Sequence, residues 1–232
     1  MNGNRVVAVI LTLNEAESIA GVIAALPRDV VGEIIVADSG STDGTPAIAA
    51  AAGARVVSLR EPGYGTACAA GAAACSGDVV LFLDGDGADR ADLAALLVAP
   101  ILAGTHDFVV GSRVRGAREP ASMSWHQVLA GRLAGWLMSS LYGVRYTDMC
   151  AFRAIRRDAL KRLALRETGY GWNIEMQMRA AQAGLRILEL PVPYRRRAGG
   201  TSKVAGSFTG SLRAGWGIVL TVLRVSLAGS EQ

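Results

Sequence analysis

Cysteine and long apolar runs are scarce in this sequence, and each shortage excludes a class of protein. There are only three cysteines, Cys68, Cys75 and Cys150. Their odd number and their lack of metal-binding spacing predict reduced thiols in a cytosolic protein. The longest late apolar run, residues 216–223, stops at Arg224. It falls well short of the ~20 residues that a membrane-spanning helix needs. No signal peptide is recognised, because polar residues lead straight into the first apolar segment.

Internal repeats and low-complexity linkers are also missing. The length of 232 residues fits one large domain, or one domain with an appendage. A hydrophobic content of 51% and 28 glycines indicate a globular chain with many tight turns, and they exclude a disordered one.

The net charge of +4 hides an asymmetry between two parts of the chain. Residues 1–110 carry 5 basic and 13 acidic residues, whereas residues 153–203 carry 12 basic and 4 acidic ones. This split predicts an acidic, metal-binding half that faces a basic, anion-binding half; a solvated surface with ordinary ion pairs is the simpler alternative. The basic part has no interleaved aromatic platform, so we expect no nucleic acid partner.

Strand-like and helix-like segments alternate through the first half of the chain. The expected strands are residues 5–11, 33–37, 55–58, 78–84 and 107–110, and the expected helices are residues 15–26, 45–52, 67–75 and 91–102. This alternation predicts an α/β fold with a doubly wound, mostly parallel sheet and helices on both faces. Later segments read as a long helix over 125–142, a return strand over 147–153 and a strand over 186–190.

The run from Asp78 to Gly87 organises the rest of the chain. Five apolar residues without alternation suit a strand that is buried on both faces, and this strand ends at Asp84 and Asp86. Successive side chains of a strand point to opposite faces, so the two carboxylates share a face. Hard oxygen ligands at the carboxyl end of a parallel strand suit Mg²⁺ or Mn²⁺ shared with a substrate diphosphate. An ordinary Asp-Gly turn is the alternative.

Seven motifs occur in order along the chain. They are residues 12–15 (TLNE), 38–45 (DSGSTDGT), Gly63 with Gly65, 84–86 (DGD), 111–113 (GSR), 147–153 (TDMCAFR) and 197–203 (RAGGTSK). Together they resemble the family 2 glycosyltransferases of GT-A fold, and most closely the dolichyl-phosphate mannose synthase-like branch. The resemblance covers residues 1–207, with a nucleotide-binding half over 1–110 and an acceptor-side half over 111–207. Residues 208–232 would form a C-terminal helical extension.

The resemblance implies a nucleotide-sugar donor, linked to UDP or GDP, and a site for each part of it. The donor-binding residues that it implies are Thr12, Asn14, Glu15, Asp38, Gly63, Gly65, Asp84, Arg197, Ser202 and Lys203. Glu15 and Asp38 can accept hydrogen bonds from a base or a ribose. Structural alternatives are a first-turn helix residue for Glu15, an Asx-turn for Asp38 and a helix cap for Asn14.

Two departures from the family pattern concern the same site. Ala88 stands where the dolichyl-phosphate mannose synthases carry a glutamine, and Tyr64 stands where many relatives carry a lysine. Asp84 and Asp86 would hold the metal, and the latter also counts as catalytic because the metal neutralises the leaving diphosphate. Arg197 and Lys203 would clamp that diphosphate.

The implied reaction is an inverting displacement at the anomeric carbon, and the acceptor decides whether a base is needed. Arg113 and Arg132 fall where relatives gather the phosphate of an acceptor, most simply a polyprenyl phosphate. Such a phosphate is already anionic at neutral pH, since its second pKa is near ~6. A soluble hydroxyl acceptor would need a carboxylate base, for which Glu175 and then Asp148 are the candidates.

Other readings of the late helices and of the whole chain remain to be compared with this function. Apolar residues of 125–142 and 208–224, with Arg213 and Arg224, suit either a peripheral membrane contact or a core face or dimer contact. We therefore expect a cytoplasmic protein, at the inner face of the membrane if it binds one. A non-catalytic nucleotide-sugar binding protein or membrane scaffold is the alternative of another class. A sugar-1-phosphate nucleotidyltransferase is disfavoured, because it would carry a glycine-rich basic loop at Thr12–Glu15.

Overall fold

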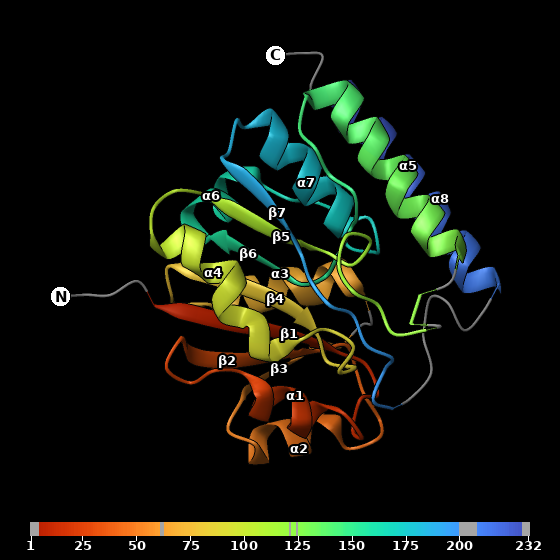
Figure 1. Cartoon of the computed structure of the whole chain (residues 1–232). Helices are drawn as coiled ribbons and strands as arrows, with labels where there is room; N and C mark the ends of the chain where they lie inside the picture. The colour runs from red at the N-terminus through yellow and green to blue at the C-terminus, as the bar shows by residue number, and fades with distance from the viewer. Residues whose placement is uncertain (1–4, 61–62, 121, 124, 200–207, 229–232) are drawn as a thin grey trace.

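A seven-stranded mixed sheet forms the centre of the molecule (Figure 1). The computed structural model describes residues 5–60, 63–120, 122–123, 125–199 and 208–228. The strand order is β3-β2-β1-β4-β6-β5-β7. The strands are β1 (Val6–Thr12), β2 (Val31–Asp38), β3 (Arg55–Ser58), β4 (Val79–Asp84), β5 (Phe108–Ser112), β6 (Arg153–Arg156) and β7 (Ile187–Pro191). The helices are α1 (Ile19–Ala25), α2 (Thr45–Ala51), α3 (Tyr64–Ala74), α4 (Ala94–Leu102) with a 3-10 turn before it (Ala91–Leu93), α5 (Trp125–Tyr142), α6 (Arg157–Leu163), α7 (Trp172–Gln182) and α8 (Phe208–Ala228).

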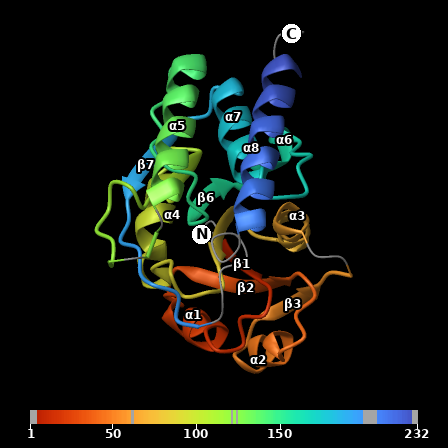
Figure 2. The same ribbon diagram turned by 90° about the vertical axis from the view of Figure 1, so that its right-hand side faces the viewer.

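The first four strands are parallel and bring three polar residues to one edge of the sheet. All seven residues of β1 are buried, as expected for a strand covered on both faces. Helices α3 and α4 lie on opposite faces of the sheet (Figures 1 and 2). In the register of the sheet Thr12 pairs with Asp38, and Leu11 pairs with Asp84. The predicted doubly wound, mostly parallel sheet is therefore confirmed, and polar side chains gather at its carboxyl edge, where open α/β sheets bind ligands.

Strand β6 corrects the expectation for residues 147–153. The strand begins only at Arg153, and it lies antiparallel between β4 and β5. Residues 147–152 are irregular because their polar groups bond elsewhere. The N–H of Thr147 donates to Glu189 Oε1 at 2.7 Å, and the N–H of Met149 donates to Asp148 Oδ1 at 2.7 Å. These contacts replace the ladder that a longer strand would have formed.

The expected helix cap at Asn14 is also wrong. Asn14 has a left-handed backbone, with φ 54°, and its Oδ1 accepts the N–H of Thr42 at 2.8 Å. Helix α1 begins four residues later than expected, at Ile19. Asparagine tolerates the left-handed region better than most residues, so it can fasten two neighbouring loops together at this position.

Helices α5, α7 and α8 form a layer beside the sheet, with α5 and α8 on either side of α7 (Figure 2). Helix α5 approaches the segment that follows it through glycines: a Cβ at Gly135 would lie 2.1 Å from the carbonyl oxygen of Tyr146. The opposite face of α5 is solvent-facing, with Leu133 57% and Trp136 68% exposed. Within the part of the chain that the structure describes, no helix is both long and apolar enough to cross a bilayer. The boundary expected at residue 207 stays a prediction.

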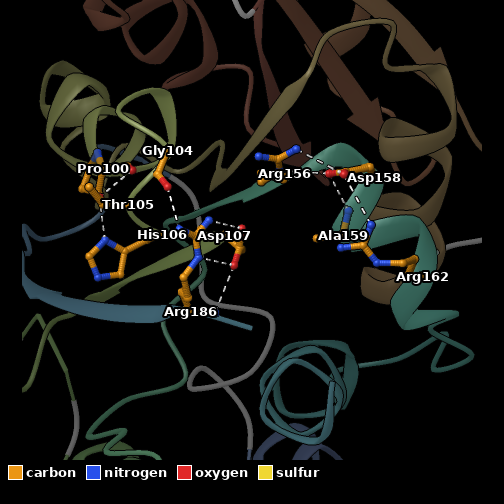
Figure 3. A network of polar contacts seen from close by, with 10 residues as sticks. All are labelled: Pro100, Gly104, Thr105, His106, Asp107, Arg156, Asp158, Ala159, Arg162 and Arg186. Carbon is orange, nitrogen blue, oxygen red and sulfur yellow. Dashed lines mark hydrogen bonds and ion pairs between the residues drawn. The ribbon is translucent and has the colours of Figure 1, made fainter. Parts of the chain in front are cut away.

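Much of the basic charge of the second half lies at the opposite, amino edge of the sheet (Figure 3). Arg186, just before β7, makes a two-pronged contact with Asp107 just before β5, at 2.9 and 2.7 Å. Asp158 at the start of α6 accepts from Arg156 and Arg162 at 3.1 and 3.3 Å. Arg186 and Arg156 thus pair with residues of neighbouring segments, whereas Arg162 pairs within α6. The predicted division into an acidic and an anion-binding half therefore does not hold for every basic residue.

Candidate active site

Thr12 and Asp38 form a tightly bonded pair where β1 and β2 end. The hydroxyl of Thr12 donates to Asp38 Oδ1 at 2.9 Å, and Asp38 Oδ2 accepts the N–H groups of Gly40 and Ser41 at 3.1 and 2.9 Å. Asp38 is only 1% exposed. The Asx-turn expected as the structural alternative for Asp38 is thus present. A carboxylate bonded in this way is rigid, and its role toward a nucleotide stays a prediction.

The loop after β1 is fastened to the loop after β2. The N–H of Asn14 donates to the Ser41 hydroxyl at 2.7 Å, and the N–H of Glu15 donates to the Thr45 hydroxyl at 2.8 Å. Asp43 adds two further hydrogen bonds to this contact between the loops, since its two oxygens accept the N–H groups of Ala16 and Thr45, both at 3.0 Å. These hydrogen bonds between the two loops hold the backbone of Glu15 in a position from which the Glu15 side chain reaches toward the end of β4.

Three aspartates, Asp84, Asp86 and Asp89, lie at and just after the end of β4, and their charges repel one another. Asp86 and Asp89 are 4% and 6% exposed. Burial, followed by the charges of Asp86 and Asp89, raises the pKa of Asp84 well above its ordinary value. Burial and Asp86 raise the pKa of Asp89 to about 7. Such a cluster favours a bound cation, because a divalent ion would remove the repulsion.

The geometry of this turn is fixed by close packing and by backbone donors. A Cβ at Gly85 would lie 2.6 Å from the Thr12 methyl group, so glycine is needed between the two aspartates. Asp86 Oδ1 accepts the N–H of Ala88 at 2.9 Å, and Asp89 Oδ2 accepts the N–H of Asp84 at 3.2 Å. Among the residues that the structure describes, no three His, Cys, Asp or Glu side chains form a complete metal site. A metal here would need oxygen ligands from a substrate or water.

Arg197 crosses from the late loop to this acidic edge. Its Nη1 lies 2.8 Å from Asp86 Oδ2, and its Nη2 lies 2.5 Å from Glu15 Oε1. The backbone supports the crossing, since the N–H of Ala198 donates to the Asp86 carbonyl at 2.9 Å. The structure thus brings together residues that are far apart in the sequence. Ser202 and Lys203 lie outside the described residues.

On the acceptor side, Arg113 and Asp148 form a two-pronged ion pair. Arg113 Nε and Nη2 each lie 2.8 Å from an oxygen of Asp148, and the Arg113 N–H adds a third bond at 2.9 Å. Burial alone would raise the pKa of Asp148, but the Arg113 contacts lower it below its ordinary value. The Arg113 guanidinium also lies 5.1 Å from the ring centroid of Tyr194. Arg132 is exposed on α5, next to Gly131, whose Cβ position is 3.5 Å from Asp148 Oδ1.

Glu175 is placed differently from what a solvent-accessible base requires. It is 0% exposed, and its Oε2 accepts the N–H groups of Arg166 and Glu167 at 3.0 and 2.7 Å. Its Oε1 accepts from Arg179 Nε at 2.9 Å. These bonds position the loop before α7. The suggested role as a general base stays a prediction, and these contacts do not favour it.

Gly63 and Gly65 also have a packing role. A Cβ at Gly65 would lie 2.5 Å from the carbonyl oxygen of Glu167, and one at Gly63 would lie 3.1 Å from that of Thr168. Helix α3 therefore begins earlier than predicted, at Tyr64, and its first turn presses on the loop before α7. The expected close approach of this backbone to a nucleotide stays a prediction.

The sequence reasoning missed a buried polar group next to Asp84. Arg153 is 1% exposed and bonds the hydroxyl of Tyr64 and the side chain of Asn173. One signal was present in the sequence: an arginine inside an otherwise apolar strand is rarely buried without a polar partner.

Comparisons with known proteins identify the class of protein that this site belongs to. The family described as "Glycosyl transferase family 2" matches residues 7–164. The uncharacterized glycosyltransferase Rv0539 of Mycobacterium tuberculosis is 38% identical over 216 residues, which cover 92% of this chain and 96% of that protein. The undecaprenyl-phosphate mannosyltransferase of Micrococcus luteus is 31% identical over 226 residues, covering 89% and 90%. The chain therefore belongs to glycosyl transferase family 2.

A solved structure supports the same assignment. The glucosyl-3-phosphoglycerate synthase from M. tuberculosis, in complex with Mn²⁺, UDP and glucosyl-3-phosphoglycerate, has a TM-score of 0.76 and 27% identity. The similarity covers 96% of this chain and 80% of the synthase. The GT-A fold, the glycosyltransferase class and the resemblance to the dolichyl-phosphate mannose synthase-like branch are thereby confirmed.

Proposed function

We propose that this protein transfers a hexose from a UDP- or GDP-linked donor to a polyprenyl phosphate, with inversion at the anomeric carbon. The observation that carries the proposal is the convergence of Glu15, Asp38, Asp84 and Asp86 at the carboxyl edge of the sheet, crossed by Arg197. That edge is where open α/β sheets bind nucleotides.

Asp84 and Asp86 would hold Mg²⁺ or Mn²⁺. The repulsion between the two charges and the raised pKa of Asp84 fit a divalent cation, and the donor diphosphate would supply further oxygen ligands. The ion would stabilise the charge that develops on the leaving nucleoside diphosphate. Arg197 would add a guanidinium fork to the same phosphates, and Ser202 and Lys203 are proposed to complete the clamp.

The contacts of the acidic side chains favour a phosphate acceptor. Asp148 is engaged by Arg113 through three hydrogen bonds, and Glu175 is engaged by two backbone N–H groups and Arg179. Neither carboxylate is therefore well placed to take a proton from a hydroxyl group. A phosphate monoester needs no base, and Arg113 with Arg132 would hold it. The similarity to an undecaprenyl-phosphate mannosyltransferase supports this choice.

A lipid acceptor also agrees with the outer surface of α5 and α8. Exposed apolar side chains on the two helices are Leu129, Leu133, Trp136, Leu141, Trp216, Val219, Leu220, Leu223 and Leu227. The two helices contain three arginines and no acidic residue. Apolar surface combined with positive charge suits the headgroup region of an anionic bilayer. The inner side of α5 packs against residues 146–148, which carry the partner of Arg113.

A soluble acceptor is the second candidate, because a structural neighbour is a glucosyl-3-phosphoglycerate synthase. Acceptor partitioning separates the two. Radiolabelled donor would be incubated with Mn²⁺ and either undecaprenyl phosphate in anionic vesicles or 3-phosphoglycerate, followed by butanol extraction. Label in the butanol phase supports the lipid acceptor, whereas label that stays in water with phosphoglycerate contradicts it. Failure to pellet with anionic vesicles at low salt would exclude the membrane contact.

The metal role is tested by Asp86→Asn beside a matched control, Asp92→Asn. Asp92 is an exposed aspartate of the same segment, paired only with Arg90 in the described contacts. We expect Asp86→Asn to lose donor turnover by at least about a hundredfold, the scale of a lost transition-state electrostatic contact, and Asp92→Asn to keep it. Equal turnover by wild type and Asp86→Asn would contradict the metal role. Binding of donor without turnover by the wild type would favour the non-catalytic alternative.

A further inference from the structure

Two tyrosines lie beside Asp84, and the functions assigned above do not use them. Tyr64 is the first residue of α3, and Tyr170 belongs to the loop before α7. Their ring centroids are 6.0 Å apart, with an interplanar angle of 27°. The Tyr64 hydroxyl contacts Arg153, which pairs with Phe82 two residues before Asp84, so the pair lies beside the end of β4. Burial, followed by the charge of Asp84, raises the pKa of both phenols. The pair therefore faces the edge of the sheet where the donor is proposed to bind.

Tyr64 is fixed by a buried polar group. Arg153 pairs with Phe82 across β6 and β4, so its side chain lies on the same face of the sheet as Asp84. Its Nη2 donates to the Tyr64 hydroxyl at 3.4 Å and also contacts Asn173 Oδ1. Asn173 Nδ2 lies 3.4 Å from the same hydroxyl. The phenol ring of Tyr64 is thus held from its polar end, packs against the core and stacks with Tyr170.

Tyr170 is positioned by a loop that three helices hold. Glu175 of α7 accepts the N–H groups of Arg166 and Glu167. The N–H of Thr66 in α3 donates to the Thr168 carbonyl at 3.1 Å, and the hydroxyl of Thr221 in α8 donates to Glu167 Oε2 at 2.7 Å. A loop bonded on three sides needs little further ordering when a ligand binds.

The exposure of Tyr170 distinguishes it from a core residue. Tyr146, which does belong to the core, is 3% exposed, whereas Tyr170 is 37% exposed. Aromatic faces that are partly open, with amide and guanidinium groups beside them, are typical of sites for small polar ligands with one apolar face. A hexose has such a face, formed by its ring C–H groups, and polar hydroxyls around it. The hexose is bonded directly to the diphosphate that Asp84 and Asp86 are proposed to anchor, so it must lie close to them.

The geometry points to the Tyr64–Tyr170 pair as the wall against which the donor hexose packs, with Tyr170 as a specificity-determining residue. This inference rests on the proposed function and names the part of the donor that the wall contacts. Arg153 and Asn173 are positioning residues, because they act on the donor through Tyr64.

The test compares the donor with and without its sugar. Wild type, Tyr170→Ala, Tyr170→Leu and Tyr170→Phe are titrated with UDP, GDP and the intact nucleotide-sugar in Mn²⁺ by calorimetry, and KM and kcat are measured. Tyr142→Ala, at the far end of α5, serves as a control. We expect Tyr170→Ala and Tyr170→Leu to weaken binding of the nucleotide-sugar about tenfold, the scale of one aromatic contact, with nucleoside diphosphate binding unchanged. Tyr170→Phe retains the ring and should bind as the wild type does.

The outcomes separate the inference from the proposed function. If nucleoside diphosphate and nucleotide-sugar lose affinity equally in Tyr170→Leu, the ring contacts the nucleotide and the inference is wrong. If neither loses affinity, the ring contacts no part of the donor, and the inference is equally wrong. If the wild type binds no nucleoside diphosphate with Mn²⁺, the proposed function itself fails and the inference fails with it. Circular dichroism of each variant shows whether a loss of affinity reflects unfolding. If Tyr170→Ala is unfolded, the comparison of Tyr170→Leu with Tyr170→Phe tests the inference.

Discussion

Arg197 offers a quantitative test of the acidic site, because it carries the positive charge that joins Asp86 to Glu15. Unit charges about 4 Å apart interact by about 4 kcal/mol at an effective dielectric constant of about 20. Burying the charges cancels part of that gain: the side chains of Arg197 and Asp86 are 26% and 5% exposed. The net contribution should lie between that of an exposed pair and that of a buried one. We therefore expect Arg197→Ala to lower the free energy of unfolding by about 2 kcal/mol in EDTA.

A divalent cation should change that result. In Arg197→Ala the carboxylates of Asp86 and Glu15 lose their partner, and Mn²⁺ can supply the missing positive charge. The deficit in melting temperature, about 4–8 °C for a chain of this size, should then shrink with Mn²⁺, which should also bind the variant more tightly than the wild type. Differential scanning fluorimetry with and without Mn²⁺ measures both effects. Arg195→Ala is the control, since Arg195 is an exposed arginine two residues away.

The reasoning would be refuted by either of two results. If Arg197→Ala melts at the temperature of Arg195→Ala in EDTA, the ion pairs with Asp86 and Glu15 contribute nothing to stability. If its deficit in melting temperature is unaffected by Mn²⁺ up to millimolar concentration, the cation does not bind at these carboxylates. Loss of donor turnover in Arg197→Ala with unchanged affinity for nucleoside diphosphate would contradict the proposed phosphate clamp.

Three further predictions follow from other contacts. The pKa of Asp89 is raised to about 7 in the folded state, so between about pH 4 and 7 the native protein holds a proton that the unfolded chain has lost. The free energy of unfolding should therefore fall as pH rises from about 4 to 7, and urea melts in EDTA over this pH range should show a weaker pH dependence of that free energy for Asp89→Asn. Gly65→Ala places a Cβ 2.5 Å from a backbone oxygen and should cost about 1–3 kcal/mol, whereas Gly21→Ala, in open space on α1, should be neutral or stabilising by thermal melts. Glu175→Gln should lower the melting temperature and turnover together without altering the pH profile of kcat; a lost pH limb would instead identify a general base.

The half of the fold in which strand-like and helix-like segments alternate along the sequence could be predicted, because each parallel strand is followed by its own crossover helix. Apolar runs without alternation located β1 and β4 correctly, and Asp84 and Asp86 fell at the strand end as expected. The position of β6 could not be predicted in the same way. Its insertion between β4 and β5 depends on pairing with residues 71 or more positions away in β4, which no local pattern records.

The roles of charged side chains were harder to predict than the strands, for a related reason. The same residue type can bind a ligand or join two elements, and only the partner decides. Glu175 lies in the first turn of α7, where a general base was expected, yet its Oε2 accepts two N–H groups of the loop that carries Tyr170. Arg186 belongs to the basic half, yet it pairs with Asp107 at the opposite edge of the sheet. Arg197 has the same chemistry as Arg186, but the backbone bond from Ala198 to Asp86 brings it to the acidic edge. A charge count along the sequence therefore identifies how many cations are present, while the backbone connections of each loop determine which of them reach the site.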